Sequence, residues 1–275
     1  MLQSINDSTR LHNGVTIPWL GLGVWQTKEG AEVENAVKYA LQSGYRSIDT
    51  AAIYRNEEGV GKGIRASGVP REDIFLTTKV WNSDQGYEET LMAFENSRKL
   101  LGTSIDLYLI HWPVEGKYIQ TWRALEKLYA DGKVKAIGVS NFMVRHLEDI
   151  LASCEVEPMV NQIEYHPYLQ QVDVREFCRE HKIRLEAWSP LMKGHILQVP
   201  EVIAIAEKHG KTPVQVVLRW DLQHGVVAIP KSVRADRIED NSKIFDFELH
   251  DEEMEVINSL ERGQRFGPDP NNFDF

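Results

Sequence analysis

The sequence predicts an α/β protein, and more narrowly a (β/α)8 TIM barrel. Short apolar and β-branched runs alternate with helical patterns along the chain, and successive runs begin roughly 25 to 42 residues apart, the size of a strand-plus-helix unit. Eight such units close most simply into a barrel. The expected strands are residues 20–24, 47–49, 74–79, 105–111, 134–140, 159–164, 184–189 and 226–230.

The segments between these strands carry apolar residues three and four positions apart, as amphipathic helices do. Three of the patterns end at Gly44, Gly102 and Gly132, and glycine is the usual residue just beyond a helix C-terminus. The longest interval, before the last strand, holds two helical patterns, at 201–209 and 213–223. The alternation therefore accounts for the chain between the first and the last strand.

Local signals mark further boundaries. Thr212 and Gln215, with Pro213 between them, form a capping box with proline at the first helical position. Beyond the barrel, residues 251–261 predict a helix with an acidic first turn, and residues 266–275 form a Pro- and Asn-rich tail that could lie across a barrel face.

The second expected strand leads into a helix that contains several glycines. Asn56 is a suitable N-cap for that helix, and Gly59 and Gly63 lie four residues apart on one side of it. Because glycine costs about 1 kcal/mol relative to alanine inside a helix, the pair predicts the close approach of another backbone. Asp49 and Tyr54 precede the helix, and on these residues alone they are a turn residue and a rim aromatic.

Composition limits the classes of function. The chain has 275 residues, 42% of them hydrophobic, which suffices for one sizeable core, and we expect a single domain over 1–275. A net charge of -10 argues against nucleic acid or an anionic membrane as a partner. The two cysteines, Cys154 and Cys178, have no metal-ligand spacing. With no signal-peptide pattern and no apolar run of about 18 residues, we expect a cytoplasmic protein. Nothing in the sequence argues strongly against a monomer, which is the state we expect.

Polar and aromatic residues follow the expected strands at their carboxyl ends, where barrels of this kind carry their chemistry. Taken singly, each has a structural explanation, such as a solvated lysine or a satisfied core histidine. Together they would form a ring of polar groups that is costly to leave without a ligand. In chain order they are Trp25, Asp49, Lys79, His111, Ser140 with Asn141, Gln162, Trp188 with Ser189, and Lys231 with Ser232.

Several kinds of site are poorly supported by this set. His111 has no HxH or HxxxH companion, so we expect no metal site. The sequence contains no GxSxG nucleophile elbow. Gln26 replaces the third glycine of a dinucleotide fingerprint in GLGVWQ, and GVGKG lacks the spacing of a P-loop. A nucleotide would have to be held by another route.

Four of the residues together support proton transfer. A tyrosine, with an ordinary pKa of about 10, donates a proton to a developing alkoxide more readily when a nearby ammonium stabilises its anion. Lys79 can supply that charge to Tyr54, Asp49 can hold the lysine in place, and His111 can orient a carbonyl oxygen. None of the four carries hydride.

A reduced nicotinamide would supply the hydride. Ser140, Asn141 and Gln162 offer the donors and acceptors that its carboxamide needs, and Trp188 offers a flat surface for its ring. Three cations within seven residues make a phosphate site that favours NADPH over NADH, and they are Lys231, Arg234 and Arg237.

The chain resembles the aldo-keto reductase superfamily from residue 21 to about residue 241. The resemblance is carried by GYRSIDTAAIYRNEEGVG, LLGTSIDLYLIHWP and IPKSVRADRIEDN, with GVSNF and NQIEYHPYL between them. By motif position it implies a catalytic tetrad, Asp49, Tyr54, Lys79 and His111, with Tyr54 as the general acid. It further implies that NADPH is held by Ser140, Asn141, Gln162, Trp188, Ser189, Leu191, Lys231, Ser232, Val233, Arg234, Arg237 and Asn241.

The resemblance also implies a substrate pocket at the barrel mouth. Trp25, Tyr54, Trp81, His111 and Trp112 would form it, and the short C-terminal tail predicts that it is open and permissive. Simple packing at the barrel rim is the alternative for the second and third of these tryptophans.

Two departures from the wider family concern the cofactor. Trp188 stands where many members carry tyrosine, which preserves a stacking surface, and residues 192–197 replace a more glycine-rich loop over the cofactor. How firmly that loop closes is left open by the sequence.

These features predict an NADPH-dependent reductase of aldehydes, ketones and α-dicarbonyls such as methylglyoxal. In its short tail and in AWSPL and FGPDP, the chain resembles the bacterial branch that includes 2,5-diketogluconate reductases, glyoxal and methylglyoxal reductases and related prostaglandin F synthases. Two other classes remain open at this point: a cofactor-sensing binding protein on the same fold, and an isomerase or hydrolase that needs no nicotinamide.

Overall fold

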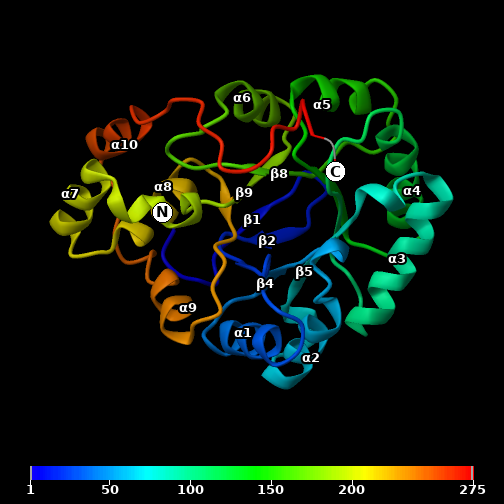
Figure 1. Ribbon diagram of the computed structural model, residues 1–275, viewed down its shortest axis with the longest axis horizontal. Helices are drawn as coiled ribbons and strands as arrows, with labels where there is room; N and C mark the ends of the chain where they lie inside the picture. The colour runs from blue at the N-terminus through cyan, green and yellow to red at the C-terminus, as the bar shows by residue number, and fades with distance from the viewer. Residues whose placement is uncertain (1, 274) are drawn as a thin grey trace.

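The computed structural model describes residues 2–273 and 275, and its central feature is a closed barrel of parallel strands (Figure 1). In this part of the chain, eight strands pair in the order β10-β9-β8-β7-β6-β5-β4-β3. Parallel bridges from Leu20 to Ala228 and from Gly23 to Lys231 close the barrel, which confirms the predicted fold class. The strands are β3 (Leu22–Gly23), β4 (Ser47–Asp49), β5 (Phe75–Val80), β6 (Leu107–Ile110), β7 (Ala136–Ser140), β8 (Val160–Glu164), β9 (Arg184–Trp188) and β10 (Val227–Ala228).

Helices surround these strands and cover the outside of the barrel (Figure 1). Every residue of β5 is buried, as in most of the other strands, because helices lie outside and side chains fill the inside. The strands therefore read as apolar runs rather than alternating patterns. The helices are α1 (Ala31–Gln42), α2 (Glu57–Ser67), α3 (Tyr87–Leu101), α4 (Tyr118–Ala130), α5 (Val144–Leu151), α6 (Val172–Glu180), α7 (Pro200–His209), α8 (Pro213–Gln223), α9 (Ala235–Asn241) and α10 (Asp251–Asn258), and the 3₁₀ turns are η1 (Ala52–Tyr54), η2 (Arg71–Asp73), η3 (Asn82–Asp84) and η4 (Met192–Gln198).

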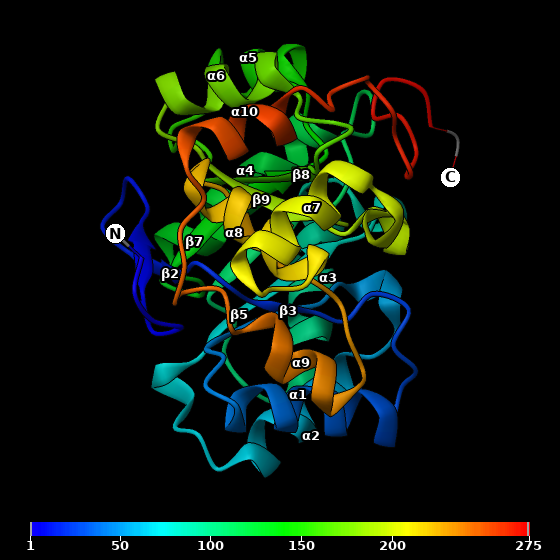
Figure 2. The same ribbon diagram turned by 90° about the vertical axis from the view of Figure 1, so that its left-hand side faces the viewer.

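An N-terminal hairpin, which the sequence did not reveal, lies at one end of the barrel. Its strands β1 (Ser8–Arg10) and β2 (Thr16–Pro18) pair antiparallel. His12 bonds the carbonyl of Pro158, which precedes β8, so the hairpin covers the amino ends of the strands. Figure 2 shows it on the side of the molecule opposite the C-terminal tail.

The glycines of α2 allow the close approach that their spacing predicts. A Cβ atom built on Gly63 would lie 2.7 Å from the carbonyl oxygen of Glu34 in α1, and one on Gly59 would lie 2.3 Å from a methyl group of Val33. Gly61 faces the carbonyl of Leu101 in α3 even more closely. The two helices can pack on α2 at this distance because it carries no side chains at these positions.

Two local expectations need correction. Asn56 stands at the N-cap position of α2, but its amide instead donates to the carbonyls of Val24 (3.0 Å) and Thr27 (3.1 Å), and its oxygen accepts from the hydroxyl of Thr50 (2.7 Å). The side chain therefore joins the loop after β3 to the loop after β4 rather than capping the helix. The last helix, α10, ends at Asn258, earlier than predicted.

The other boundary signals are confirmed. Thr212 and Gln215 form the reciprocal capping box at the start of α8. Gly102 has the left-handed φ of 64° expected just beyond α3. Within residues 2–273 and 275, none of the helices has the length and apolar character needed to cross a membrane.

Candidate active site

A buried ion pair lies at the carboxyl ends of β4 and β5. The Lys79 ammonium donates to both carboxylate oxygens of Asp49, at 2.7 and 2.8 Å, and to the carbonyl of Thr50 at 2.9 Å. All three ammonium hydrogens are thus used. Lys79 is 0% exposed and Asp49 only 3%. Burial, the largest single effect, would lower the pKa of Lys79, but Asp49, Tyr54 and Glu186 together outweigh it, and the pKa is raised.

Tyr54 ends the η1 turn directly after β4 and lies next to this pair. The Lys79 nitrogen is 5.3 Å from the centre of the Tyr54 ring. Burial raises the pKa of Tyr54 to about 12, while the Lys79 charge acts in the opposite direction. The phenol is therefore protonated at neutral pH, and the adjacent ammonium favours its anion if the proton leaves.

His111 follows β6 and is packed between two aromatic rings. Its imidazole makes edge contacts with Tyr54 (5.7 Å between ring centres) and with Trp81 (5.1 Å). Burial, and secondarily the Lys79 charge, lower the pKa of His111 well below its usual range. The ring is therefore neutral at physiological pH and can donate one hydrogen bond to a ligand oxygen.

A second group of polar residues follows β7, β8 and β9. Asn141 donates to the carbonyl of His111 (2.9 Å) and to the hydroxyl of Ser140 (3.1 Å), and its oxygen accepts from the indole N–H of Trp188 at 2.8 Å. Its backbone is left-handed, with φ 65°. These bonds hold the amide in one orientation and fix the Trp188 ring against it.

Gln162 connects this group to the ion pair. Its Nε2 donates to Asp49 at 2.7 Å and to Glu186 of β9 at 2.6 Å, so both amide hydrogens are used and the carbonyl oxygen remains for a ligand. Glu186 is not among the residues predicted from the sequence. Strand alternation could have found it, because Glu186 lies two residues before Trp188 and therefore faces the same side of β9.

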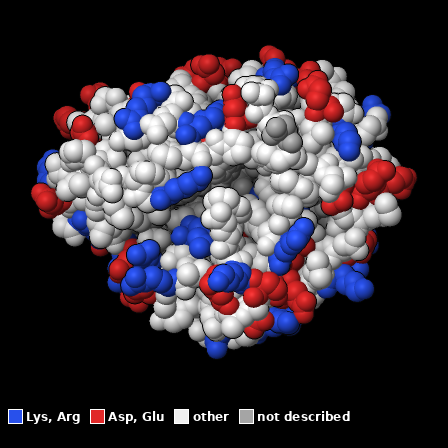
Figure 3. All heavy atoms as spheres, viewed as in Figure 1, with Lys and Arg blue, Asp and Glu red and all other residues white. Residues whose placement is uncertain are grey.

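The basic residues after β10 are not equivalent. Lys231 and Arg237 are exposed and form no ion pair within the described part of the chain, whereas the Arg234 guanidinium is bonded to Asp236. Ser232 accepts from the backbone N–H of Arg234 at 3.2 Å. Several Lys and Arg side chains border the hollow in the centre of this face (Figure 3).

The remaining predicted cofactor residues lie in the segment after β9 and in the segment from β10 to the end of α9. Ser189 follows β9 with a left-handed φ of 54°, and Leu191 is partly buried just before η4. Val233 is 38% exposed, and Asn241 is 7% exposed at the end of α9.

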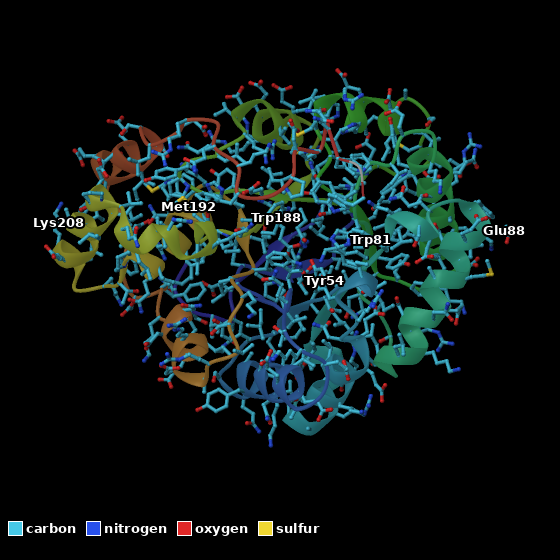
Figure 4. The ribbon with its side chains drawn as sticks, in the orientation of Figure 1. Tyr54, Trp81, Glu88, Trp188, Met192 and Lys208 are labelled. Carbon is cyan, nitrogen blue, oxygen red and sulfur yellow. The ribbon has the colours of Figure 1, made fainter. Side chains whose placement is uncertain are left out.

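The η4 segment is held from two sides. Met192 and Ile196 are fully buried, which anchors it to the core. Lys193 donates to the carbonyl of Phe266 at 2.5 Å and lies 6.0 Å from the centre of the Trp25 ring. Figure 4 shows Met192 near Trp188, on the side of the barrel mouth away from Trp81.

The C-terminal tail crosses the barrel mouth and packs against the Trp188 ring. The buried carboxylate of Glu164 accepts from the backbone N–H groups of Phe266 (2.7 Å) and Gly267 (3.1 Å). A Cβ atom on Gly267 would lie 2.3 Å from the Trp188 ring, so only glycine allows this contact. The prediction that the tail could lie across a barrel face is confirmed.

Aromatic residues of the tail lie against two walls of the predicted pocket, so the tail contributes to the pocket although it is short. Phe275 stacks on Trp81, with ring centres 5.8 Å apart and planes at 7°, and Phe273 contacts Trp112 at 5.2 Å. The tail and the rim together border a hollow of about 570 Å³, and Trp81, Phe273 and Phe275 are part of its lining. Trp25 is 46% exposed and faces Lys193 rather than these rings.

The structure thus gathers the predicted tetrad, with Asp49 and Lys79 in contact and Tyr54 and His111 beside them. A family model described as "Aldo/keto reductase family" matches residues 19–262. The chain belongs to the aldo/keto reductase family. The β/α units described above are those of a family member, and the four residues lie at or just beyond the carboxyl ends of β4, β5 and β6.

Individual family members are similar over their whole lengths. Glyoxal reductase of Bacillus subtilis (strain 168) is 58% identical over 276 residues, covering 100% of both chains. The 9,11-endoperoxide prostaglandin H2 reductase of Trypanosoma cruzi (strain CL Brener) is 58% identical, covering 96% of this chain and 94% of that one. A crystal structure of a Gox0644 mutant in complex with NADPH has a TM-score of 0.92 and 49% identity, covering 98% of this chain and 99% of that one.

The residues of this family member suit a nicotinamide nucleotide better than a metal ion. Gln162 keeps one free carbonyl oxygen, the Trp188 ring is partly exposed at the barrel mouth, and two exposed cations lie beyond β10. Over residues 2–273 and 275, His, Cys, Asp and Glu side chains form no cluster able to hold a metal ion.

Proposed function

We propose that this aldo/keto reductase reduces aldehydes, ketones and α-dicarbonyls to alcohols with NADPH. The observation that carries the proposal is the buried Asp49–Lys79 pair beside Tyr54, with the neutral His111 ring against the same phenol. The B. subtilis relative named glyoxal reductase supports the substrate class, and the NADPH complex of the Gox0644 mutant supports the cofactor.

In this proposal the phenol of Tyr54 is the general acid. When bound, NADPH supplies the hydride that the carbonyl carbon receives. The Tyr54 hydroxyl gives its proton to the carbonyl oxygen, which completes the alcohol and leaves a phenolate. Lys79 stabilises that phenolate, Asp49 keeps the lysine charged and in place, and His111 donates a hydrogen bond that orients the carbonyl oxygen.

The nicotinamide end of the cofactor would lie against Trp188. Its carboxamide N–H group would donate to the free oxygen of Gln162, and the amide of Asn141, with Ser140 beside it, would border the ring. Ser189 and Leu191 would follow the pyrophosphate.

The adenosine end would lie at the start of α9. Lys231 and Arg237 would bind the 2′-phosphate, because their charges are not neutralised by carboxylates in the described residues. Ser232, Val233, Arg234 and Asn241 would complete the adenosine site. Trp25, Trp81 and Trp112, with His111, would contact the substrate.

The proposal includes a cytoplasmic, monomeric enzyme whose residues 1–275 act as one domain on small-molecule carbonyls. Two free cysteines, Cys154 and Cys178, suit a reducing compartment. Nucleic acid and membranes are not proposed as partners of an acidic chain.

Steady NADPH consumption by the purified protein tests the proposal. We expect turnover, measured as the loss of NADPH absorbance, with methylglyoxal and with 4-nitrobenzaldehyde. We expect no loss of absorbance without a carbonyl compound. Cofactor binding without turnover of any carbonyl would contradict it and support a cofactor-sensing protein. Activity on an ester or a sugar in the absence of nicotinamide would instead support a hydrolase or an isomerase.

A further inference from the structure

Glu186 is a buried acid that the proposed reaction has not yet used. It lies in the middle of β9, between Leu185 and Ala187, and is 1% exposed. In register it pairs with Gln162 of β8. Its Oε2 accepts from the Gln162 amide at 2.6 Å, and its Oε1 has no hydrogen-bond partner among residues 2–273 and 275.

Glu186 and Asp49 share a single amide nitrogen, but their surroundings differ. Asp49 receives two hydrogen bonds from the Lys79 ammonium in addition to the one from Gln162. Glu186 receives only the bond from Gln162 in the described part of the chain. A buried carboxylate without a cation is strongly disfavoured, so the single negative charge of this pair resides on Asp49 and Glu186 is a neutral acid.

The surroundings of Glu186 support this assignment. Burial, and after it the negative charge of Asp49, raise the pKa of Glu186 to about 8, although the Gln162 bond and the Lys79 charge act in the opposite direction. The proton is best placed on Oε1, because Oε2 is occupied as an acceptor for Gln162.

We propose that Glu186 is a positioning residue for the reduction: as a neutral acid it fixes the Gln162 amide for the nicotinamide, and when it loses its proton it slows the reaction. The inference rests on the proposed function. Both neighbours of the Gln162 nitrogen are carboxyl oxygens, so the nitrogen must face them and the carbonyl oxygen must face the ligand. Without Glu186, one of the two acceptors that fix this orientation is lost.

The slower reaction after Glu186 loses its proton follows from the negative charge that Glu186 then carries. The titratable and charged groups that face Glu186 are Asp49 from β4, Lys79 from β5 and Tyr54 from η1. When the Glu186 proton leaves to solvent, the site gains a negative charge that raises the pKa of Tyr54, so the phenol gives up its proton less readily. Reduction is therefore faster while Glu186 is neutral and slows as the pH rises through about 8.

Two variants separate the effect of the acceptor oxygen that Glu186 offers to Gln162 from the effect of the Glu186 charge. Glu186→Gln keeps an acceptor oxygen for Gln162 and is neutral at every pH, whereas Glu186→Ala removes the acceptor. For the wild-type protein we expect kcat to fall with an inflection near pH 8, and for Glu186→Gln we expect that inflection to be absent. We expect Glu186→Ala to weaken NADPH binding roughly fivefold, measured by fluorescence quenching, and Glu186→Gln to restore most of this loss.

Infrared difference spectroscopy measures whether the Glu186 carboxyl group carries a proton, and the measurement requires no turnover. The wild-type protein should lose a protonated-carboxyl band with a midpoint near pH 8, and the band should be missing in Glu186→Gln. Asp221 is also a buried acid with a pKa well above its usual range, and the comparison with the variant removes its contribution.

The outcomes are distinct. An inflection near pH 8 that persists in Glu186→Gln, or equal NADPH affinities for Glu186→Ala and the wild type, would overturn the positioning role. No carboxyl band lost near pH 8 would overturn the protonation state. If the wild-type protein turned over no carbonyl, the proposed function would fail, while the infrared titration and the NADPH affinities would still decide the inference about Glu186.

Discussion

Replacing Lys79 by methionine should both destabilise the protein and abolish turnover. The change removes three hydrogen bonds and leaves the carboxylate of Asp49, 3% exposed, with the Gln162 amide as its one remaining donor from a described side chain. Breaking a buried ion pair by removing one partner costs about 3–5 kcal/mol. Since a domain of ordinary stability has about 5–15 kcal/mol, the variant should fold but unfold at much lower denaturant.

Urea unfolding followed by tryptophan fluorescence measures this cost. The double variant Lys79→Met with Asp49→Asn should regain on the order of 2 kcal/mol, because the buried charge is then gone. Lys127→Met is a matched control: its ammonium lies 2.6 and 2.8 Å from Asp131, but the pair is exposed, so little change is expected.

A stability of Lys79→Met equal to that of the wild type would refute the argument from burial. So would a double variant less stable than either single one, because the cost would then not come from an unpaired charge.

Two further predictions concern the cofactor. Arg237→Ala should weaken NADPH binding roughly tenfold or more while leaving NADH binding almost unaffected. Arg234→Ala is the control and should have a smaller effect, because the Arg234 guanidinium already bonds Asp236. Equal losses for both nucleotides would show that Arg237 does not hold the 2′-phosphate. Gly267→Ala places a methyl group within 2.3 Å of the Trp188 ring. The variant should weaken NADPH binding roughly two- to tenfold, because the ring has to move. An unchanged dissociation constant for NADPH, measured by fluorescence quenching, would show that the tail does not support Trp188.

The barrel could be predicted because its signals are local. Strands buried on both faces are apolar runs, and helices ending near glycine separate them at regular intervals. The hairpin could not be predicted in this way, because β1 and β2 have only three residues each and alternate exposed and buried positions in a polar stretch. It is stabilised instead by contacts such as the one from His12 to Pro158, far away in sequence.

The site was predictable to the extent that strand ends meet at one rim. Asp49, Lys79 and His111 lie together because parallel neighbouring strands deliver them there. Glu186 was missed because a charged residue inside a strand only interrupts the apolar run by which the strand is predicted. Its role becomes visible once its register partner, Gln162, is known. The contacts of the tail with the pocket walls were missed because the stacking of Phe275 on Trp81 depends on the path of the whole tail.

The central claim, that Tyr54 gives its proton to the carbonyl oxygen, is tested most directly by Tyr54→Phe. The variant keeps the ring that packs against His111 but lacks the hydroxyl. We predict that kcat for methylglyoxal reduction falls by roughly two orders of magnitude or more, because a positioned general acid contributes about that much, while quenching of protein fluorescence by NADPH is retained. Turnover by Tyr54→Phe at the wild-type rate, with NADPH bound equally well, would contradict the account.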